Sequence, residues 1–465
     1  MRRRYFILAM GASLAGCAGV RKDAPSEAAV QAPSTWRAPT SAGTAVLQAD
    51  WWRAFDDASL NALVEEVLSH SDDIALAAVR VQEARAQFRY TQAQRLPNVG
   101  AALEGGRDRD VNPGFGVPEE QAAGEGLIDA TFDLDLFGRL KADSEAARST
   151  LLATQDAQYT VRLSVITSLV SGYFTLLALD ARLAIVRETL DVRRKELHVE
   201  QRRFGAGYSN ALDLTRAQAE LAATEQLVPD LELAIAKTEN GLSILLGRAP
   251  GSIVRGGHFD RLSLPDVPVS LPSVLLRSRP DIAAAEARLA ATDHTLDAAR
   301  AAFLPDIQLA VSGGLAGSTL VNASPVGIWS IGGSILAPIF DAGRLQAQQD
   351  AAIARRDEAA FAYRKTTLQA FREVEDDLAA VAKNRQQFDL LTQERDVLAR
   401  TFQLATRRYR EGYASYLDQL DAQRNLLSSE LALVQSRLDR FNAAVNLCQA
   451  LGGGWSPNVQ ELSRR

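Results

Sequence analysis

The chain has 465 residues, which is long enough to bury a large core or to form several domains. Its formal net charge is −6 and it has no basic patch, so the composition argues against nucleic acid as a partner. It contains only two cysteines, which excludes a disulfide framework.

The first 50 residues have the pattern of a secretion signal followed by a tether. Three arginines at 2–4 precede an apolar run, and the residues LAGC then end at Cys17. A basic end, an apolar stretch too short to span a bilayer and small residues before a cysteine are typical of a lipoprotein signal. We predict a signal peptide at 1–16, lipidation of Cys17 and a tether at 17–50. An ordinary signal peptide with an incidental cysteine is the alternative.

Most of the remaining sequence is repeated. Residues 202–225 and 407–430 are identical at 10 of 24 aligned positions, and both have a glycine turn between two helix-like stretches. Leu304-Pro305 repeats Leu96-Pro97, and Gly412-Tyr413 repeats Gly207-Tyr208. We predict a first structural repeat at 51–255, a second at 256–455 and a C-terminal tail at 456–465, with the two repeats forming one interleaved domain.

In each repeat a segment with a hydrophobic period of two precedes a long helical segment. Aliphatic and polar side chains alternate at 99–103, 128–136, 307–312 and 329–339. Four strands of about ten residues fit tilted strands of a membrane barrel, although a half-buried sheet of a soluble protein has the same pattern. Asp129, Asp133 and Asp135 share one face, which we expect to line a water-filled lumen.

The long segments have a helical period near 3.5, which predicts a left-handed coiled coil. About 65 residues of helix would extend roughly 100 Å, more than a globular core needs. Residues 163–179 carry no charge, but the equivalent residues 368–384 carry several, so we predict a buried helix here and no transmembrane helix. The two apolar seams consist of Leu176, Leu183, Leu190, Leu197 and Phe204, and of Phe388, Leu391, Leu398, Phe402 and Tyr409.

The order of these elements resembles the TolC-like outer-membrane efflux proteins over residues 50–455. The segments that carry the resemblance are WWRAFDDASLNALVEEVL, RSRPDIAAAEARL, APIFDAGRL, RYREGYASYLDQLDAQRNLL and NLCQALGGGW. The lipobox is similar to that of the NodT and OprM-like lipoprotein branch. The resemblance implies an α plus membrane β fold: duplicated long-helix coiled-coil hairpins with four transmembrane β-strands per chain, assembled as a homotrimer into a β-barrel and an α-helical barrel.

The resemblance also implies a location and a function. The protein would lie in the outer membrane, lipid-anchored and membrane-spanning, with a periplasmic extension. It would be the exit duct of a tripartite efflux pump for drugs or other small toxic compounds. The implied partners are a periplasmic membrane-fusion adaptor, an inner-membrane resistance-nodulation-division pump and outer-membrane lipid. Two alternatives are the channel of a protein secretion system and a lipid-anchored periplasmic coiled-coil scaffold without a pore.

Functional positions follow from the same resemblance. The glycine turns would form the periplasmic tips where the adaptor docks, and acidic residues after the turns would narrow the closed tip. Arg216 occupies the position of Asp421 in the other repeat, which suggests an ionic link between the two hairpins. A solvated helix face is the alternative for these charges. The expected gate residues are Asp418, Asp421, Asp213, Arg216 and Tyr409, and the expected docking turns contain Gly205, Gly207 and Gly412.

No motif indicates catalysis. The four histidines, at 70, 198, 258 and 294, are scattered, two methionines are too few for a thioether metal relay, and no phosphate-binding loop occurs. We therefore expect neither an enzyme nor a cofactor or metal site. We expect Cys448 to be a small buried apolar residue.

Overall fold

The computed structural model describes residues 25–38, 47–111, 116, 118–319 and 324–456. It divides into two units, one built mainly of residues 94–146 and 289–365 and the other mainly of 32–93, 147–288 and 366–456. The signal peptide and Cys17 lie outside the described residues. The helices of four or more residues and the strands are η3 (Trp51–Phe55), α2 (Ala58–His70), α3 (Asp72–Ala93), β1 (Asn98–Val111), β2 (Pro118–Asp133), α4 (Arg139–Gly205), α5 (Ala211–Glu225), α6 (Leu227–Leu245), α7 (Pro272–Ser278), α8 (Pro280–Ala301), β3 (Asp306–Ser318), β4 (Val326–Leu336), α9 (Arg344–Arg410) and α10 (Tyr416–Ala450).

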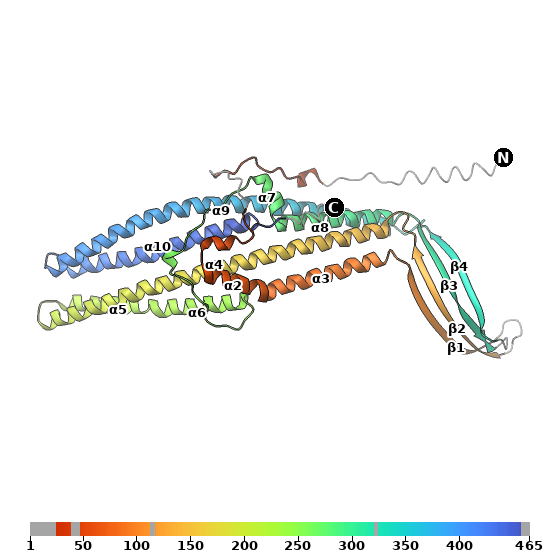
Figure 1. Ribbon diagram of the computed structural model, residues 1–465, viewed down its shortest axis with the longest axis horizontal. Coiled ribbons are helices and arrows are strands. Elements are labelled where there is room, and N and C mark those ends of the chain that lie inside the picture. Colours follow the sequence, from red (N-terminus) through yellow and green to blue (C-terminus); the bar gives the residue numbers. More distant parts are fainter. Residues whose placement is uncertain (1–24, 39–46, 112–115, 117, 320–323, 457–465) are drawn as a thin grey trace. The chain divides into compact units, whose positions relative to one another are not determined.

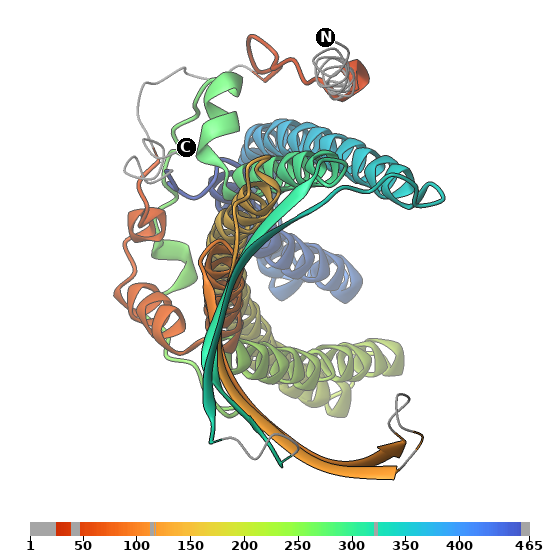
Figure 2. The same cartoon turned by 90° about the vertical axis from the view of Figure 1, so that its right-hand side faces the viewer.

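The first unit contains one antiparallel sheet in the order β1-β2-β3-β4, which is visibly curved (Figure 2). Its register places polar residues of neighbouring strands opposite one another: Asp129 pairs with Ser312, and Ser312 pairs with Ser330. The next row is apolar, because Ala130 pairs with Val311 and Val311 with Ile331. Since successive side chains of a strand point to opposite faces, the sheet has one polar and one apolar face, as its alternating sequence predicts.

The ends of two strands differ from the prediction. β2 ends at Asp133, and Asp135 has a positive φ of 44°. The Asp135 carboxylate accepts hydrogen bonds from the backbone N–H groups of Leu140 (2.9 Å) and Lys141 (2.8 Å), so it caps the start of α4. The assignment of Asp135 to the lumen-lining strand face is therefore wrong. β4 likewise ends at Leu336, before the predicted strand end at 339.

The two long helices have the same length, as the sequence repeat predicts. α4 and α9 each contain 67 residues. In the second unit they run beside α5 and α10, with which they form two helical hairpins (Figure 1). Leu176, Leu183 and Leu190 of the predicted first seam are buried, whereas Phe204 at the end of the helix is exposed. The second seam is only partly buried within one chain.

The core of the second unit contains the uncharged part of α4. Val165 through Ala178 of this helix pack with η3, α2 and the end of α10. One described helix, α4, is long and apolar enough by composition to cross a membrane, but over half of its most apolar window is buried inside the protein. This agrees with the predicted buried helix. Cys448 is 3% exposed, and burial raises the pKa of its thiol to about 12, so it is the inert apolar residue expected.

Part of the predicted tether is held against the second unit. Trp36 is buried, its indole N–H donates to the carbonyl oxygen of Ser270 (2.7 Å), and its ring packs edge-on against Phe371. The Arg37 backbone N–H donates to the Glu375 carboxylate (2.8 Å). Order thus begins before the Trp51–Trp52 pair, because a single large aromatic side chain is enough to anchor an otherwise aperiodic segment.

Candidate functional site

Both helical hairpins end in the same turn. The backbone N–H of Tyr208 donates to the Arg203 carbonyl, and that of Tyr413 donates to the Arg408 carbonyl, each at 2.8 Å. Gly207 and Gly412 have φ values of 76° and 81° and fill the left-handed position of this Schellman motif. Gly205 is still the last residue of α4 and is not in this conformation. Two of the three predicted turn glycines are therefore required by the backbone.

Asp418 caps the helix that follows the second turn. Its carboxylate accepts hydrogen bonds from the Ser415 hydroxyl (2.8 Å) and backbone N–H (2.9 Å), and the Ser415 oxygen accepts from the Asp418 N–H (3.2 Å). This capping box lowers the pKa of Asp418, mainly through the Ser415 side chain. The carboxylate remains exposed to solvent and ionised.

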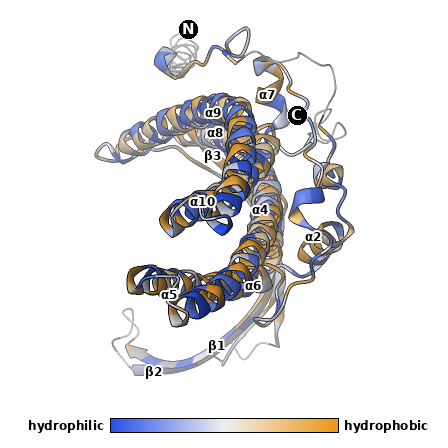
Figure 3. Cartoon of the chain, turned by 90° about the vertical axis from the view of Figure 1, so that its left-hand side faces the viewer, coloured by the Kyte–Doolittle hydropathy of each residue, from blue (hydrophilic) through white to orange (hydrophobic). Residues whose placement is uncertain are grey.

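The predicted link through Arg216 is not formed within one chain. Arg216 pairs with Asp213, three residues earlier on α5, at 3.2 Å. Asp421 pairs instead with Arg424 at 3.4 Å. Each charge thus has a neighbour at i+3 on its own helix, which a helical spacing favours over a partner on another hairpin. Figure 3 shows hydrophilic and hydrophobic residues mixed along α5 and α10.

The two hairpins are joined by Glu220, which the sequence analysis missed. Its carboxylate accepts from Arg193 of α4 (2.7 Å) and from Nε of Arg424 of α10 (2.8 Å). Arg193 also donates to the Glu220 carbonyl (2.7 Å) and is 5% exposed. Burial would raise the pKa of Glu220, but the Arg424 hydrogen bond and the charge of Arg193 hold it below its usual value. We call these three residues the Glu220 network.

A second set of contacts lies one turn closer to the tips. The Tyr409 hydroxyl of α9 donates to the Glu200 carboxylate of α4, which also accepts from Ser209 (3.0 Å). The side-chain amide of Gln419 on α10 donates to Glu196 (2.7 Å). Tyr409, predicted as a gate residue, therefore joins the two hairpins through a buried carboxylate.

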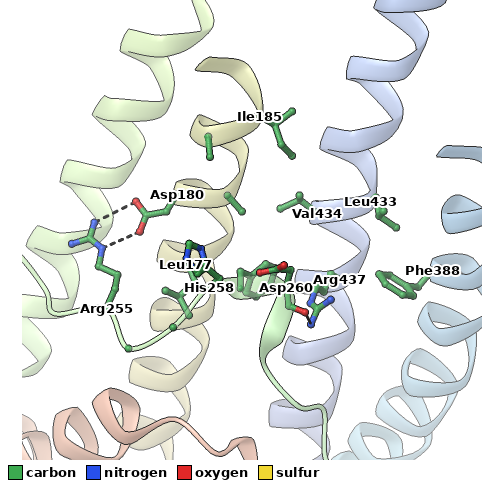
Figure 4. Close-up of a pocket in the computed structure, with 15 residues that line it drawn as sticks. Leu177, Asp180, Ile185, Arg255, His258, Asp260, Phe388, Leu433, Val434 and Arg437 are labelled. Carbon is green, nitrogen blue, oxygen red and sulfur yellow. Dashed lines mark hydrogen bonds and ion pairs between the residues drawn. The ribbon is translucent and has the colours of Figure 1, made fainter. Parts of the chain in front are cut away.

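A cavity lies elsewhere in the second unit, between α4, α10, Phe388 of α9 and the segment 255–260 (Figure 4). Its volume is about 680 Å³. Arg255 forms an ion pair with Asp180 (2.9 Å) and a second with Glu239 (2.5 Å). Arg437 donates to the carbonyl oxygens of Asp260 and Leu262. These charged groups already bind one another or the backbone, so the arrangement fits a docked loop better than a catalytic centre.

Comparison with known proteins gives a consistent result. Residues 63–248 and 271–453 match the family model described as outer membrane efflux protein. The chain is 32% identical to the pyoverdine export outer membrane protein OpmQ of Pseudomonas aeruginosa, covering 95% of both chains. It is 35% identical to the cation efflux system protein CusC of Escherichia coli, covering 88% of both.

Solved structures agree with these sequence relatives. The outer-membrane channel OprN matches with a TM-score of 0.85 and 28% identity, covering 94% of this chain and 100% of that one. The open state of the MtrE outer membrane channel of Neisseria gonorrhoeae matches with a TM-score of 0.83 and 26% identity, covering 95% and 99%.

Proposed function

The chain belongs to the outer membrane efflux protein family, and we propose that it is a passive exit duct gated at its helix tips. It is the outer-membrane channel of a tripartite efflux pump, with a periplasmic extension. It works as a homotrimer with a periplasmic adaptor and an inner-membrane pump. The observation that carries the duct is the register of the sheet, which gives one polar and one apolar face.

The number of strands supports the trimer. One chain contributes a four-stranded sheet, which cannot close around a pore. Two chains would give eight strands, and an eight-stranded barrel is filled by its own side chains. Three chains are the smallest number that leaves an open lumen. Native mass spectrometry of the detergent-solubilised protein should give three chains per particle, and a stable dimer would contradict this geometry.

The class of exported solute can be proposed only in general terms. OpmQ is named for pyoverdine export and CusC for cation efflux, so related proteins carry unlike compounds. We propose that this duct exports drugs or other small toxic compounds without catalysing a reaction, and that selection of the solute belongs to the pump. We also propose that the two repeats, 51–255 and 256–455, form one interleaved domain.

The tips are the proposed gate and docking site. The turns at Gly205–Gly207 and Gly412 would contact the adaptor, and Asp418 and Asp421 would face the axis of the closed tunnel. In a trimer the same carboxylates approach one another, and two unit charges about 4 Å apart interact by roughly 4 kcal/mol at an effective dielectric of about 20. Their repulsion would favour opening, and the contacts between the hairpins would oppose it.

We expect the double substitution Asp418→Ala with Asp421→Ala to lower cation selectivity and to reduce block by a trivalent cation, because a ring of carboxylates attracts cations. Planar-bilayer recordings with the cation on the periplasmic side measure both. Arg216→Ala serves as a comparison: since Arg216 pairs within its own helix, it should change conductance less than Glu220 substitutions. Unchanged block in the double variant would mean that the carboxylates only solvate a helix face.

We propose that Cys17 carries the lipid anchor. Cys17→Ser should abolish acylation while the strands and the trimer still form, because a lipid chain adds membrane affinity but no contact within the barrel. Mass spectrometry of the mature protein measures the modification directly. Wild-type protein without lipid would refute the proposal.

A further inference from the structure

A second cavity lies between the ends of the two hairpins, and we call it the tip cavity. Its volume is about 290 Å³. Its walls come from three helices: α4 contributes Glu196 and Glu200, α9 contributes Tyr409, and α10 contributes Tyr416 and Gln419. It therefore touches both hairpins at the place where they would separate if the tips opened.

The tip cavity contains two carboxylates and an amide oxygen that can accept hydrogen bonds. Glu200 is 1% exposed and Glu196 is half-buried. Burial raises the pKa of Glu196 despite the hydrogen bonds from Gln419 and Gln423 and the nearby charges of Arg193 and Arg410. Gln419 is 4% exposed, and its amide nitrogen is used in the bond to Glu196. Its Oε1 atom is buried and has no hydrogen-bond partner among the described residues. Burial that its neighbours do not fully offset destabilises the charged form of Glu196, and a buried acceptor without a donor is also unfavourable, so a bound cation with N–H donors would relieve both.

The aromatic residues favour the same kind of ligand. The rings of Tyr409 and Tyr416 lie 5.6 Å apart, and the Arg203 guanidinium already sits 4.8 Å from the centre of the Tyr409 ring. The phenol ring of Tyr409 thus already accepts a cation on its face. Lys195 and Arg410 also line the cavity, but both are exposed, so water and salt screen their charges.

We propose that the tip cavity binds a small organic ammonium ion with an aromatic or short aliphatic body. Its N–H groups would donate to Glu196 and to Oε1 of Gln419, and its apolar body would lie among Val192, Val199 and Tyr416. A metal ion fits less well, because among the described residues no three His, Cys, Asp or Glu side chains come together to hold one.

The proposed consequence is stabilisation of the closed tips, and this step rests on the gate described above. A ligand bound to residues of α4 and α10 together prefers the state in which these helices are adjacent. It must therefore shift the equilibrium toward closure by its difference in affinity for the two states.

Isothermal titration calorimetry on the purified full-length protein tests the site, with phenethylammonium as the probe. We expect saturable binding with one site per chain. The variants Glu196→Gln and Gln419→Met should each bind the probe about tenfold more weakly than the wild-type protein, or weaker still. Glu188→Gln removes an exposed carboxylate from the same helix and should bind normally. 3-Phenylpropionate, which has the same body and the opposite charge, should not bind.

A further control distinguishes binding in the tip cavity from binding to the carboxylates of Asp418 and Asp421. Asp418→Ala with Asp421→Ala should retain phenethylammonium binding. Loss of binding in this variant with normal binding in Glu196→Gln would overturn the assignment, as would absence of binding or equal binding of 3-phenylpropionate.

Planar-bilayer recordings test the link to the gate separately. Phenethylammonium should lower the open probability of the wild-type channel and of the Asp418→Ala, Asp421→Ala channel, but not that of Glu196→Gln. Binding without any effect on conductance would overturn the link to the gate and leave the site in place. A protein that binds the probe but never conducts would instead contradict the duct itself.

Discussion

Replacing Glu220 with leucine should destabilise the helical region by about 3 to 5 kcal/mol, because it removes the carboxylate that is paired with the buried guanidinium of Arg193 within the first hairpin. Arg193 is 5% exposed, and leucine would keep the backbone carbonyl to which it donates but would remove the carboxylate. The same change removes the hydrogen bond between Glu220 and Arg424, which lies on the other hairpin. The unfolding midpoint of the helical region, followed by circular dichroism, should fall accordingly.

A matched control is available on the same helix. Glu225 forms an exposed ion pair with Arg194 at 3.3 Å, and Glu225→Leu should cost about 1 kcal/mol or less. Glu220→Leu should also raise the open probability in planar bilayers, whereas Glu225→Leu should not. Equal stability and equal open probability in the two variants would show that the Glu220 network does not hold the hairpins together.

Ile331→Arg should destabilise the assembled trimer by about 2 to 4 kcal/mol, because a charge at the centre of a lipid-facing strand is costly. Ile331 lies at the middle of β4, opposite Val311, in the apolar row of the sheet. The temperature at which the trimer dissociates on a gel measures the effect.

The neighbouring residue provides the control. Ser330 pairs with Ser312 on the opposite, polar face, so Ser330→Arg should cost little where the lumen contains water. The two variants carry the same new side chain at adjacent positions. Similar losses of trimer would be incompatible with a sheet that has one face in lipid and one in water.

The features that the sequence predicted correctly are local or repeated. Alternation at 128–133 and 307–312 defines the faces of the strands because the side-chain period of a strand is two. Gly207 and Gly412 lie at equal distances from equivalent motifs, so the two turns and the equal length of α4 and α9 could be inferred without a structure. The buried helix at 163–179 followed from comparing the two repeats.

The predictions that failed or stay open concern the partners of single side chains. Asp135 continues the alternation of β2 by sequence, but the chain turns after Asp133 and its carboxylate caps α4 instead. Within one chain, Arg216 pairs with Asp213 on its own helix, and a link from Arg216 to another hairpin stays a prediction. Arg193 falls three residues after Leu190, at a core position of the seam, and a charge there was a signal that a buried counter-charge exists. Its identity as Glu220 depends on helix packing, which periodicity does not specify.

The most direct test of the duct is the conductance of purified trimer in a planar bilayer, recorded for the wild-type protein and for Glu220→Leu. The polar face of Asp129, Ser312 and Ser330 predicts stepwise, water-filled conductance, rare in the wild-type protein if the tips rest closed and frequent in Glu220→Leu. An assembled trimer that inserts in the bilayer and gives no conductance steps in either protein would contradict the duct.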